Sequence, residues 1–181
     1  NQYFGVFQNG ELKVRGIEAR RGDSPPFIAQ VQMRMLELLA AQDAPLPDIQ
    51  PAIALLRRKL ADLRAGRVPR EALLVSQRLS REPGEYRQPS PAGRAAMQMQ
   101  ASGVASPDGK PMRPGQHVRF VYTRGAPGVY AWDLPQPPDP ASLDLERYAR
   151  LLLRAAAALL APFQAIPDHS TNAPCRLDKI S

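Results

Sequence analysis

YFGVFQNGELKVRGIEARRGD, residues 3–23, is the stretch that decides how this chain begins to fold. Two alternating runs flank Asn9-Gly10, a dipeptide that favours a type I′ turn because both central residues of that turn adopt positive φ. The stretch therefore predicts a β-hairpin. Its second strand leads into Arg20 and Arg21 before Ser24-Pro25-Pro26 ends it. We expect this hairpin to hold two guanidinium groups in a fixed place, where they can bind an anion.

Helical periodicity dominates the rest of the chain. It predicts a helix over 27–40, a second from the cap Asp48 to Gly66, and a last one from Leu145 to about Leu160, ended by Pro162. Ser90-Pro91 opens a shorter helix, as a cap followed by proline commonly does. Short apolar segments at 73–79, 117–124 and 129–132 predict strands, the last two forming a second hairpin, and the proline-rich segment 135–140 is expected to be an extended linker. The fold class expected is α+β: a mainly helical domain with an N-terminal β-hairpin and a small inserted β element.

Size and cysteine content limit the classes of protein. A chain of 181 residues makes about one domain, and buries roughly 70% of its unfolded surface. The lone Cys175 excludes an internal disulfide, and His117 and His169 are too far apart to suggest a metal motif. No segment resembles a signal peptide or approaches the ~20 apolar residues that span a membrane. We expect a cytoplasmic setting, and, because the chain starts abruptly at Asn1, a fragment of a longer protein.

The charge balance points to an anionic partner. Lys and Arg number 24 against 17 Asp and Glu, which gives a net charge of +7. A high-GC coding bias explains why Arg outnumbers Lys, but it does not explain the excess of positive charge. Nucleic acid is the first candidate partner and an acidic protein is the second.

Catalytic patterns are missing from the sequence. The carboxylates are scattered, with no close pair at a strand end to hold a divalent metal, and no Gly-rich phosphate loop is present. Neither His117 nor His169 neighbours a plausible nucleophile. The chain is therefore not expected to be a self-contained enzyme. A divergent nuclease or primase-like enzyme stays open as an alternative, and it would need a clustered carboxylate site. A regulatory or scaffold module that binds an acidic protein is the other alternative.

Arginines on strands or at strand ends are the candidate phosphate ligands, since regular backbone fixes where such side chains point. The arginines of the helix 49–64 are as readily explained as a solvated face. Two tyrosines, Tyr3 and Tyr86, are suited to bond a phosphate or stack on a sugar. The residues predicted to bind DNA are Tyr3, Lys13, Arg15, Arg20, Arg21, Arg78, Arg81, Tyr86, Arg87 and Arg119.

The order of these features resembles the C-terminal part of family B DNA polymerases. The resemblance spans nearly the whole chain, and it is carried by Tyr3-Phe4-Gly5-Val6 with Lys13–Glu18, Arg21-Gly22-Asp23, Leu79–Tyr86 with Ser90-Pro91, Arg113–Val118, and Pro138-Asp139-Pro140 with the helix around Tyr148. The departures are Asn1 where the family has a lysine, Gly22 where it commonly has Arg, and Ala92 where many relatives have His.

The resemblance implies a palm hairpin over 1–24, a thumb over 25–165 and a tail, expected to be disordered, over 166–181. It implies that the chain grips primer–template duplex DNA irrespective of sequence, with Tyr3 steadying the primer strand and Arg21 and Asp23 at the junction that positions it. Palm, fingers and exonuclease domains of the same polypeptide would lie upstream and carry out nucleotidyl transfer. Mg²⁺ is expected in that parent polymerase and no cofactor in this part, with a cytoplasmic, nucleoid-associated location.

Overall fold

The structure is a computed structural model that describes residues 3–6, 12–15, 23–42, 47–82, 85, 87–104 and 112–164, with the backbone alone for 3–6, 12–15 and 164. Its helices and strands are β1 (Tyr3–Val6), β2 (Leu12–Arg15), α1 (Pro26–Ala40), α2 (Gln50–Arg64), β3 (Val75–Arg78), α3 (Pro91–Ala101), β4 (His117–Tyr122), β5 (Val129–Ala131) and α4 (Leu145–Gln164). The predicted α+β class with a small inserted β element is confirmed.

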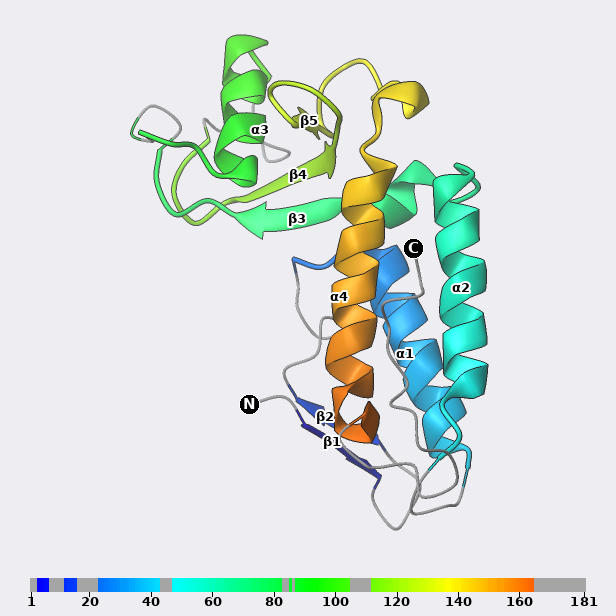
Figure 1. Ribbon diagram of the computed structural model, residues 1–181. Coiled ribbons are helices and arrows are strands. Elements are labelled where there is room, and N and C mark those ends of the chain that lie inside the picture. The colour runs from blue at the N-terminus through cyan, green and yellow to red at the C-terminus, as the bar shows by residue number, and fades with distance from the viewer. Residues whose placement is uncertain are drawn as a thin grey trace.

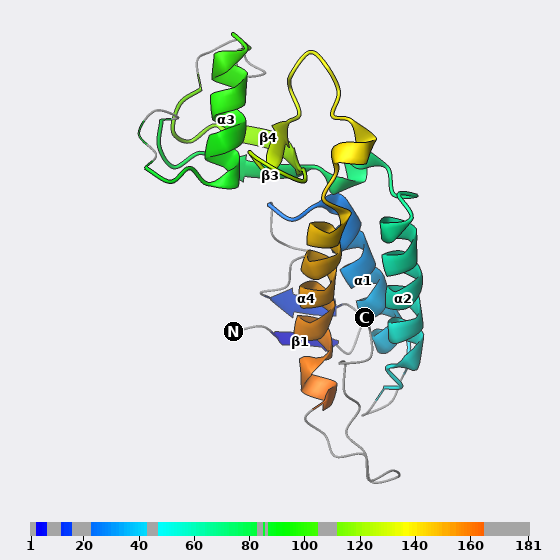
Figure 2. The same cartoon turned by 45° about the horizontal axis from the view of Figure 1, so that its top comes forward.

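Two regions make up the body of the molecule (Figure 1). Helices α1, α2 and α4 pack against one another as a helical layer. Strands β3, β4 and β5 form an antiparallel sheet in that order, and with α3 they make a sheet lobe at one end of the helices. Figure 2 shows the same division from a second direction. The β1–β2 hairpin lies apart from the sheet lobe, toward the other end of the helical layer (Figure 1).

The helical layer follows directly from hydrophobic periodicity. In α1 the buried side chains recur on one face, at Phe27, Ile28, Val31, Met35 and Leu39 among others. Helix α2 also buries one apolar face, and the apolar face of α4 packs against both α1 and α2. Burying one apolar stripe of each helix is what stabilises such a layer, because an isolated helix of this length is marginal in water.

Helix boundaries agree with the sequence at most ends. Ser90 Oγ accepts a hydrogen bond from the backbone N–H of Gly93 at 3.1 Å, so it caps α3 as predicted. The N-cap of α2 is Ile49 and not the predicted Asp48, which lies one residue earlier and accepts a hydrogen bond from the backbone N–H of Gln50 at 2.9 Å. Gly66 follows α2 with φ +68°, the left-handed conformation that glycine adopts most easily.

The end of α4 differs from the prediction. Pro162 lies inside the helix, which continues to Gln164. Proline at this position removes the hydrogen bond to the carbonyl of Ala158 and crowds that carbonyl, but it lies in the last turn, where little of the helix follows. Phe163 packs against the core and so helps to hold the last turn.

The N-terminal strands pair as predicted, with a different register. β1 and β2 are antiparallel, with Tyr3 opposite Arg15 and Val6 opposite Leu12. These pairs are centred on residue 9, whereas a two-residue turn at Asn9-Gly10 would centre them between residues 9 and 10. The register therefore differs by one residue from that of a two-residue turn. Asn9 and Gly10 themselves lie outside the described residues.

The segment expected to be an extended linker, 135–140, packs against the sheet lobe. Pro138 is buried, and the Tyr130 hydroxyl donates a hydrogen bond to the carbonyl of Gln136 at 2.9 Å. A short 3₁₀ helix, Pro140–Ser142, follows and is capped by Asp139. Within the described residues no helix is long and apolar enough to cross a membrane.

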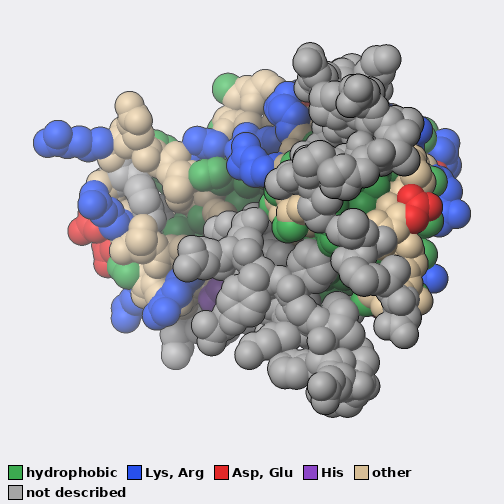
Figure 3. Space-filling model, turned by 60° about the horizontal axis from the view of Figure 1, so that its bottom comes forward, with side chains coloured by type: hydrophobic (Ala, Val, Ile, Leu, Met, Phe, Trp, Pro, Cys, Tyr) green, Lys and Arg blue, Asp and Glu red, His purple; other side chains and the backbone are tan. Residues whose placement is uncertain are grey.

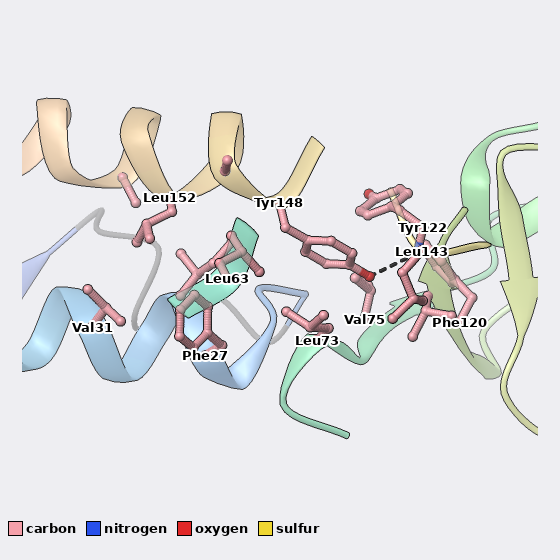
Figure 4. Packing of buried hydrophobic residues seen from close by; sticks show 14 of the residues in the cluster. Phe27, Val31, Leu63, Leu73, Val75, Phe120, Tyr122, Leu143, Tyr148 and Leu152 are labelled. Carbon is pink, nitrogen blue, oxygen red and sulfur yellow. Dashed lines mark hydrogen bonds between the residues drawn. The ribbon is translucent and has the colours of Figure 1, made fainter. Parts of the chain in front are cut away.

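Tyr148 connects the two regions (Figure 4). Its ring is fully buried at the start of α4, and its hydroxyl accepts a hydrogen bond from the backbone N–H of Tyr122 in β4 at 2.8 Å. Phe120, Tyr122 and Leu143 lie beyond its hydroxyl on the side of the sheet, whereas Leu63 and Leu152 lie on the side of the helices. The buried side chains consequently form one continuous core through both regions.

Candidate nucleic-acid interface

One face of the β3–β4 pair carries polar and basic side chains. Ser76 lies opposite Arg119, and Arg78 lies opposite His117. Alternation along each strand puts all four on the same face, and Ser76 Oγ lies 3.3 Å from Nδ1 of His117. Arg78 and His117 are exposed, and the other two are half-buried. This set, Ser76, Arg78, His117 and Arg119, is called the basic sheet face below.

A glycine turn positions Arg78. The Nε of Arg78 donates a hydrogen bond to the carbonyl of Gly115 at 3.0 Å. Gly115 has φ +92°, and a Cβ added there would stand 3.2 Å from Nη2 of Arg78. Glycine is therefore favoured at this position by the backbone conformation, and a Cβ there would also displace the guanidinium of Arg78 by a few tenths of an ångström. The Arg113-Pro114-Gly115 segment thus acts as a support for Arg78.

Arg119 has a carboxylate partner. Its guanidinium makes a two-point ion pair with Asp133, with Nε to Oδ2 at 3.2 Å and Nη2 bonded to Oδ1. Its hydrogen bond to Asp133 raises the pKa of Arg119 above its ordinary value. The charge of Arg119 is therefore largely balanced within the lobe, which leaves Arg78 and His117 as the accessible basic groups of the basic sheet face.

Helix α4 carries a second set of arginines, Arg147, Arg150 and Arg154, called the α4 arginine row. The guanidinium carbon of Arg147 lies 3.8 Å from the ring centroid of Tyr122, a cation–π contact that fixes its direction. Arg150 and Arg154 are exposed, and neither has an ion pair or hydrogen bond with another described residue. The three arginines are spaced at i, i+3 and i+7, which places them along one side of α4.

The basic residues of α2 and the turn after it have mixed surroundings. Arg64 pairs with Glu146 of α4 at 3.1 Å, and Arg67 pairs with Asp62 at 2.8 Å. Arg57 and Arg58 are exposed on the outer side of the helix. This agrees with the interpretation that the α2 arginines are mainly a solvated face.

Other predicted site residues are placed only in part. Arg20, Arg21 and Tyr86 lie outside the described residues, and the side chains of Tyr3, Lys13 and Arg15 are not described. Arg81 is exposed and has an interaction partner, and Arg87 is exposed. Arg78 and Arg119 are brought together by the sheet register. The predicted set omitted His117, which the register places opposite Arg78, and Arg154, which lines a cavity described below.

Charge on the visible face is predominantly positive. Figure 3 shows more Lys and Arg side chains than Asp and Glu side chains over the surface that is not grey. The described residues bring together no group of three or more His, Cys, Asp or Glu side chains that could hold a metal ion.

Several DNA polymerases are related to this chain in sequence or structure. A sequence model of DNA polymerase family B matches residues 1–151. DNA polymerase 2 of Aeropyrum pernix is 26% identical over 129 residues, which are 71% of this chain and 15% of that protein. The DNA polymerase of Archaeoglobus fulgidus is 26% identical over 106 residues, 59% of this chain and 13% of the relative.

A solved structure shows the same fold. The family B DNA polymerase from the hyperthermophilic archaeon Pyrobaculum calidifontis matches with a TM-score of 0.65 at 19% identity, covering 87% of this chain and 20% of that one. This chain thus spans only a fifth or less of these polymerases. Because the family match extends over most of the sequence, from residue 1 to residue 151, the chain belongs to DNA polymerase family B.

Proposed function

We propose that this chain is the last palm hairpin and the thumb of a DNA-directed DNA polymerase, and that it grips primer–template duplex DNA irrespective of sequence. The chemistry of nucleotidyl transfer, with its Mg²⁺, belongs to palm, fingers and exonuclease domains of the same polypeptide. The parent enzyme serves DNA replication or repair, at the nucleoid in the cytoplasm.

The observation that carries the proposal is the placement of arginines on regular backbone without carboxylate partners among the described residues. Arg78 is supported by the Gly115 turn, and Arg150 and Arg154 stand one turn apart on α4. Exposed arginines in fixed positions suit the phosphates of a duplex, because guanidinium groups bond phosphate oxygens with two parallel N–H donors. Membership of DNA polymerase family B supports duplex DNA as the anionic partner.

Salt dependence of duplex binding tests the proposal. The affinity of the 181-residue chain for a blunt DNA duplex is measured between 50 and 200 mM salt. If three phosphates are neutralised, a slope of about −0.9 per phosphate predicts a loss of roughly 40-fold over this range. Binding that is absent, or that does not change with salt, would overturn the proposal.

A double substitution tests the predicted basic corner. Replacing Arg20 and Arg21 together by Ala should weaken binding by a similar factor for duplexes of unrelated sequence, because phosphate contacts carry no sequence information. The matched control is Arg57→Ala with Arg58→Ala on the outer side of α2, for which little change is expected. A loss confined to one DNA sequence would contradict sequence-independent gripping.

A further inference from the structure

A cavity of about 180 Å³ lies where the N-terminal end of α1, the strands β3 and β4 and helix α4 meet. Its apolar part is formed by Ile28, Val75 and Leu151, and its polar part includes Gln77 and Arg154. We call it the junction cavity, since Asp23 and Ser24, the residues that lead from the hairpin segment into α1, also line it.

The junction cavity has one accessible cationic group. Arg154 is exposed and makes no ion pair or hydrogen bond with another described residue, and the side chain of Gln77 likewise has no such bond. Asp23 and Ser24 both already have interaction partners. The polar groups of the cavity that are available to a ligand are therefore the guanidinium of Arg154 and the side-chain amide of Gln77.

The electrostatics at the cavity combine two contributions of positive sign. Besides Arg154, the N-terminal end of α1 faces the cavity, since Pro25 and Ile28 both line it. The first turn of α1 holds no acidic residue and its N-cap makes no side-chain hydrogen bond. The positive end of the helix dipole is thus not neutralised within α1, and it supports anion binding beside Arg154, with Asp23 opposing it in part.

The wall of the junction cavity that Tyr122 forms is held in place by contacts with α4. Tyr122 lines the cavity, its backbone N–H bonds the hydroxyl of Tyr148 at 2.8 Å, and the guanidinium of Arg147 stacks 3.8 Å from its ring centroid. A preorganised wall lowers the cost of ordering a ligand.

The volume restricts what the cavity can take. Pockets for whole small molecules usually measure about 300–1,000 Å³, so 180 Å³ fits one part of a larger ligand. A sugar–phosphate unit has both of the required parts, an apolar sugar face and an anionic phosphate.

We propose that the junction cavity seats one sugar–phosphate unit of a DNA strand, with the phosphate on Arg154 and Gln77 and the sugar against Leu151. This inference rests on the proposed gripping of duplex DNA and names one specific subsite for it. Arg150 lies one turn away, about 6 Å along the helix axis, and is placed for a neighbouring phosphate.

A phosphate scan tests the proposal. Duplexes are made with one uncharged methylphosphonate linkage at successive positions, and their affinities for the wild-type chain and for Arg154→Gln are compared. For the wild-type chain, a methylphosphonate at one particular position should lower the affinity by about fivefold or more. For Arg154→Gln, a methylphosphonate at that position should no longer matter, because the contact is already lost. The affinity for unmodified duplex should fall by about the same factor, and the slope of log affinity against log salt should decrease in magnitude by about 1.

Two further variants distinguish binding in the junction cavity from general electrostatic attraction to DNA. Gln77→Trp keeps every charge but fills the cavity, so it should remove the same positional effect, with melting measured to verify that it folds. Arg58→Gln, an exposed helix arginine on α2, should leave the scan unchanged. If Arg154→Gln gives the wild-type scan while the wild type binds duplex, the subsite is wrong and duplex gripping stands. If the wild type binds no duplex, both proposals fall.

Discussion

The helical layer and the sheet lobe are stabilised by different kinds of contact. The helical layer depends on apolar side chains that recur with helical spacing. Among its described residues Gln32 is the one buried polar side chain, and it donates a hydrogen bond to the carbonyl of Ala155 at 2.9 Å. The strands of the sheet lobe are three to six residues long, too short to be stable alone. Hydrogen bonds from side chains to backbone fix that lobe in addition to its core.

Gln98 of α3 is the main example in the sheet lobe. Its Nε2 donates to the carbonyl of Val129 at 2.8 Å, and its Oε1 accepts from the backbone N–H of Ala131 at 2.9 Å. β5 is at the edge of the sheet, so the amide of Gln98 pairs with its free side as another strand would. The comparison indicates that the region with the basic sheet face depends on individual polar contacts, whereas the helical layer depends on repeated apolar ones.

The largest expected effect comes from removing the side chain that joins the two regions. Tyr148→Ala should lower the free energy of unfolding by about 3–5 kcal/mol, because a fully buried aromatic ring leaves a cavity. It should also raise the amide exchange rates of Phe120–Tyr122, since the bond to Tyr122 is lost. Denaturant unfolding and hydrogen exchange measure the two effects.

Leu60→Ala is the matched control for the helical layer. Leu60 of α2 is buried, so truncating it should cost about 2–5 kcal/mol. It should change exchange in the sheet only as far as global stability falls. If Tyr148→Ala and Leu60→Ala gave the same exchange pattern in β4, Tyr148 would not be the specific connection between the regions.

The next effect tests the edge of the sheet. Gln98→Met should destabilise the protein by about 2–3 kcal/mol, since two backbone groups of β5 lose their partners. Gln100→Met, an exposed position on the same helix, should change stability little. Equal stabilities of the two variants in a denaturant titration would show that water replaces Gln98 at this edge.

The hydroxyl of Tyr148 gives a smaller effect with a defined pH dependence. Tyr148→Phe leaves the backbone N–H of Tyr122 without its acceptor, which should lower the free energy of unfolding by about 1–2 kcal/mol. Burial raises the pKa of Tyr148 above its ordinary value of 10.0. A group whose folded pKa is raised contributes stability below its unfolded pKa and loses it as pH rises.

Alkaline titration tests this sign. The wild type should lose stability as pH rises above 10, where the unfolded chain ionises Tyr148 first, and the loss should be smaller in Tyr148→Phe. Parallel stability curves for the two proteins between pH 8 and 11 would contradict the assignment.

The sequence alone predicted the helical layer well, because burial repeats at helical spacing in Ile28, Val31 and Met35, and local caps such as Ser90 mark helix ends. It did not reveal that β3 joins the second hairpin in one sheet. That pairing joins residues about 40 positions apart, and no local pattern records it. The continuation of α4 past Pro162 also depends on packing, here of Phe163.

For the candidate site, the sequence predicted that arginines on strands or at strand ends would be the phosphate ligands. The sequence correctly put Arg78 and Arg119 on strands, but their surroundings come from distant residues. Gly115 supports Arg78 and Asp133 pairs with Arg119, and neither partner can be assigned without the register. The junction cavity is formed by residues of four elements, so only the fold reveals it.

The smallest expected effect concerns an ion pair on the surface of the helical layer. Because apolar contacts stabilise this layer, its stability should depend little on surface polar contacts. The hydrogen bond from Arg67 holds the pKa of Asp62 below its usual range, aided by the charges of Arg67, Lys59 and Arg58 and opposed by desolvation. A depressed folded pKa contributes stability above the unfolded value, and this contribution is lost as pH falls through the folded value.

Arg67→Gln should therefore raise the pKa of Asp62 toward its ordinary value, as measured by the NMR shift of its carboxyl carbon. Glu71 is an internal control, because its pKa is lowered first by its own backbone hydrogen bond and then by Arg70. Its pKa should not change in Arg67→Gln. Any small stability difference between the variant and the wild type should disappear at low pH, where Asp62 is protonated in both folded and unfolded chains. A large difference at neutral pH would mean that surface polar contacts matter as much to the helical layer as Gln98 does to the sheet lobe.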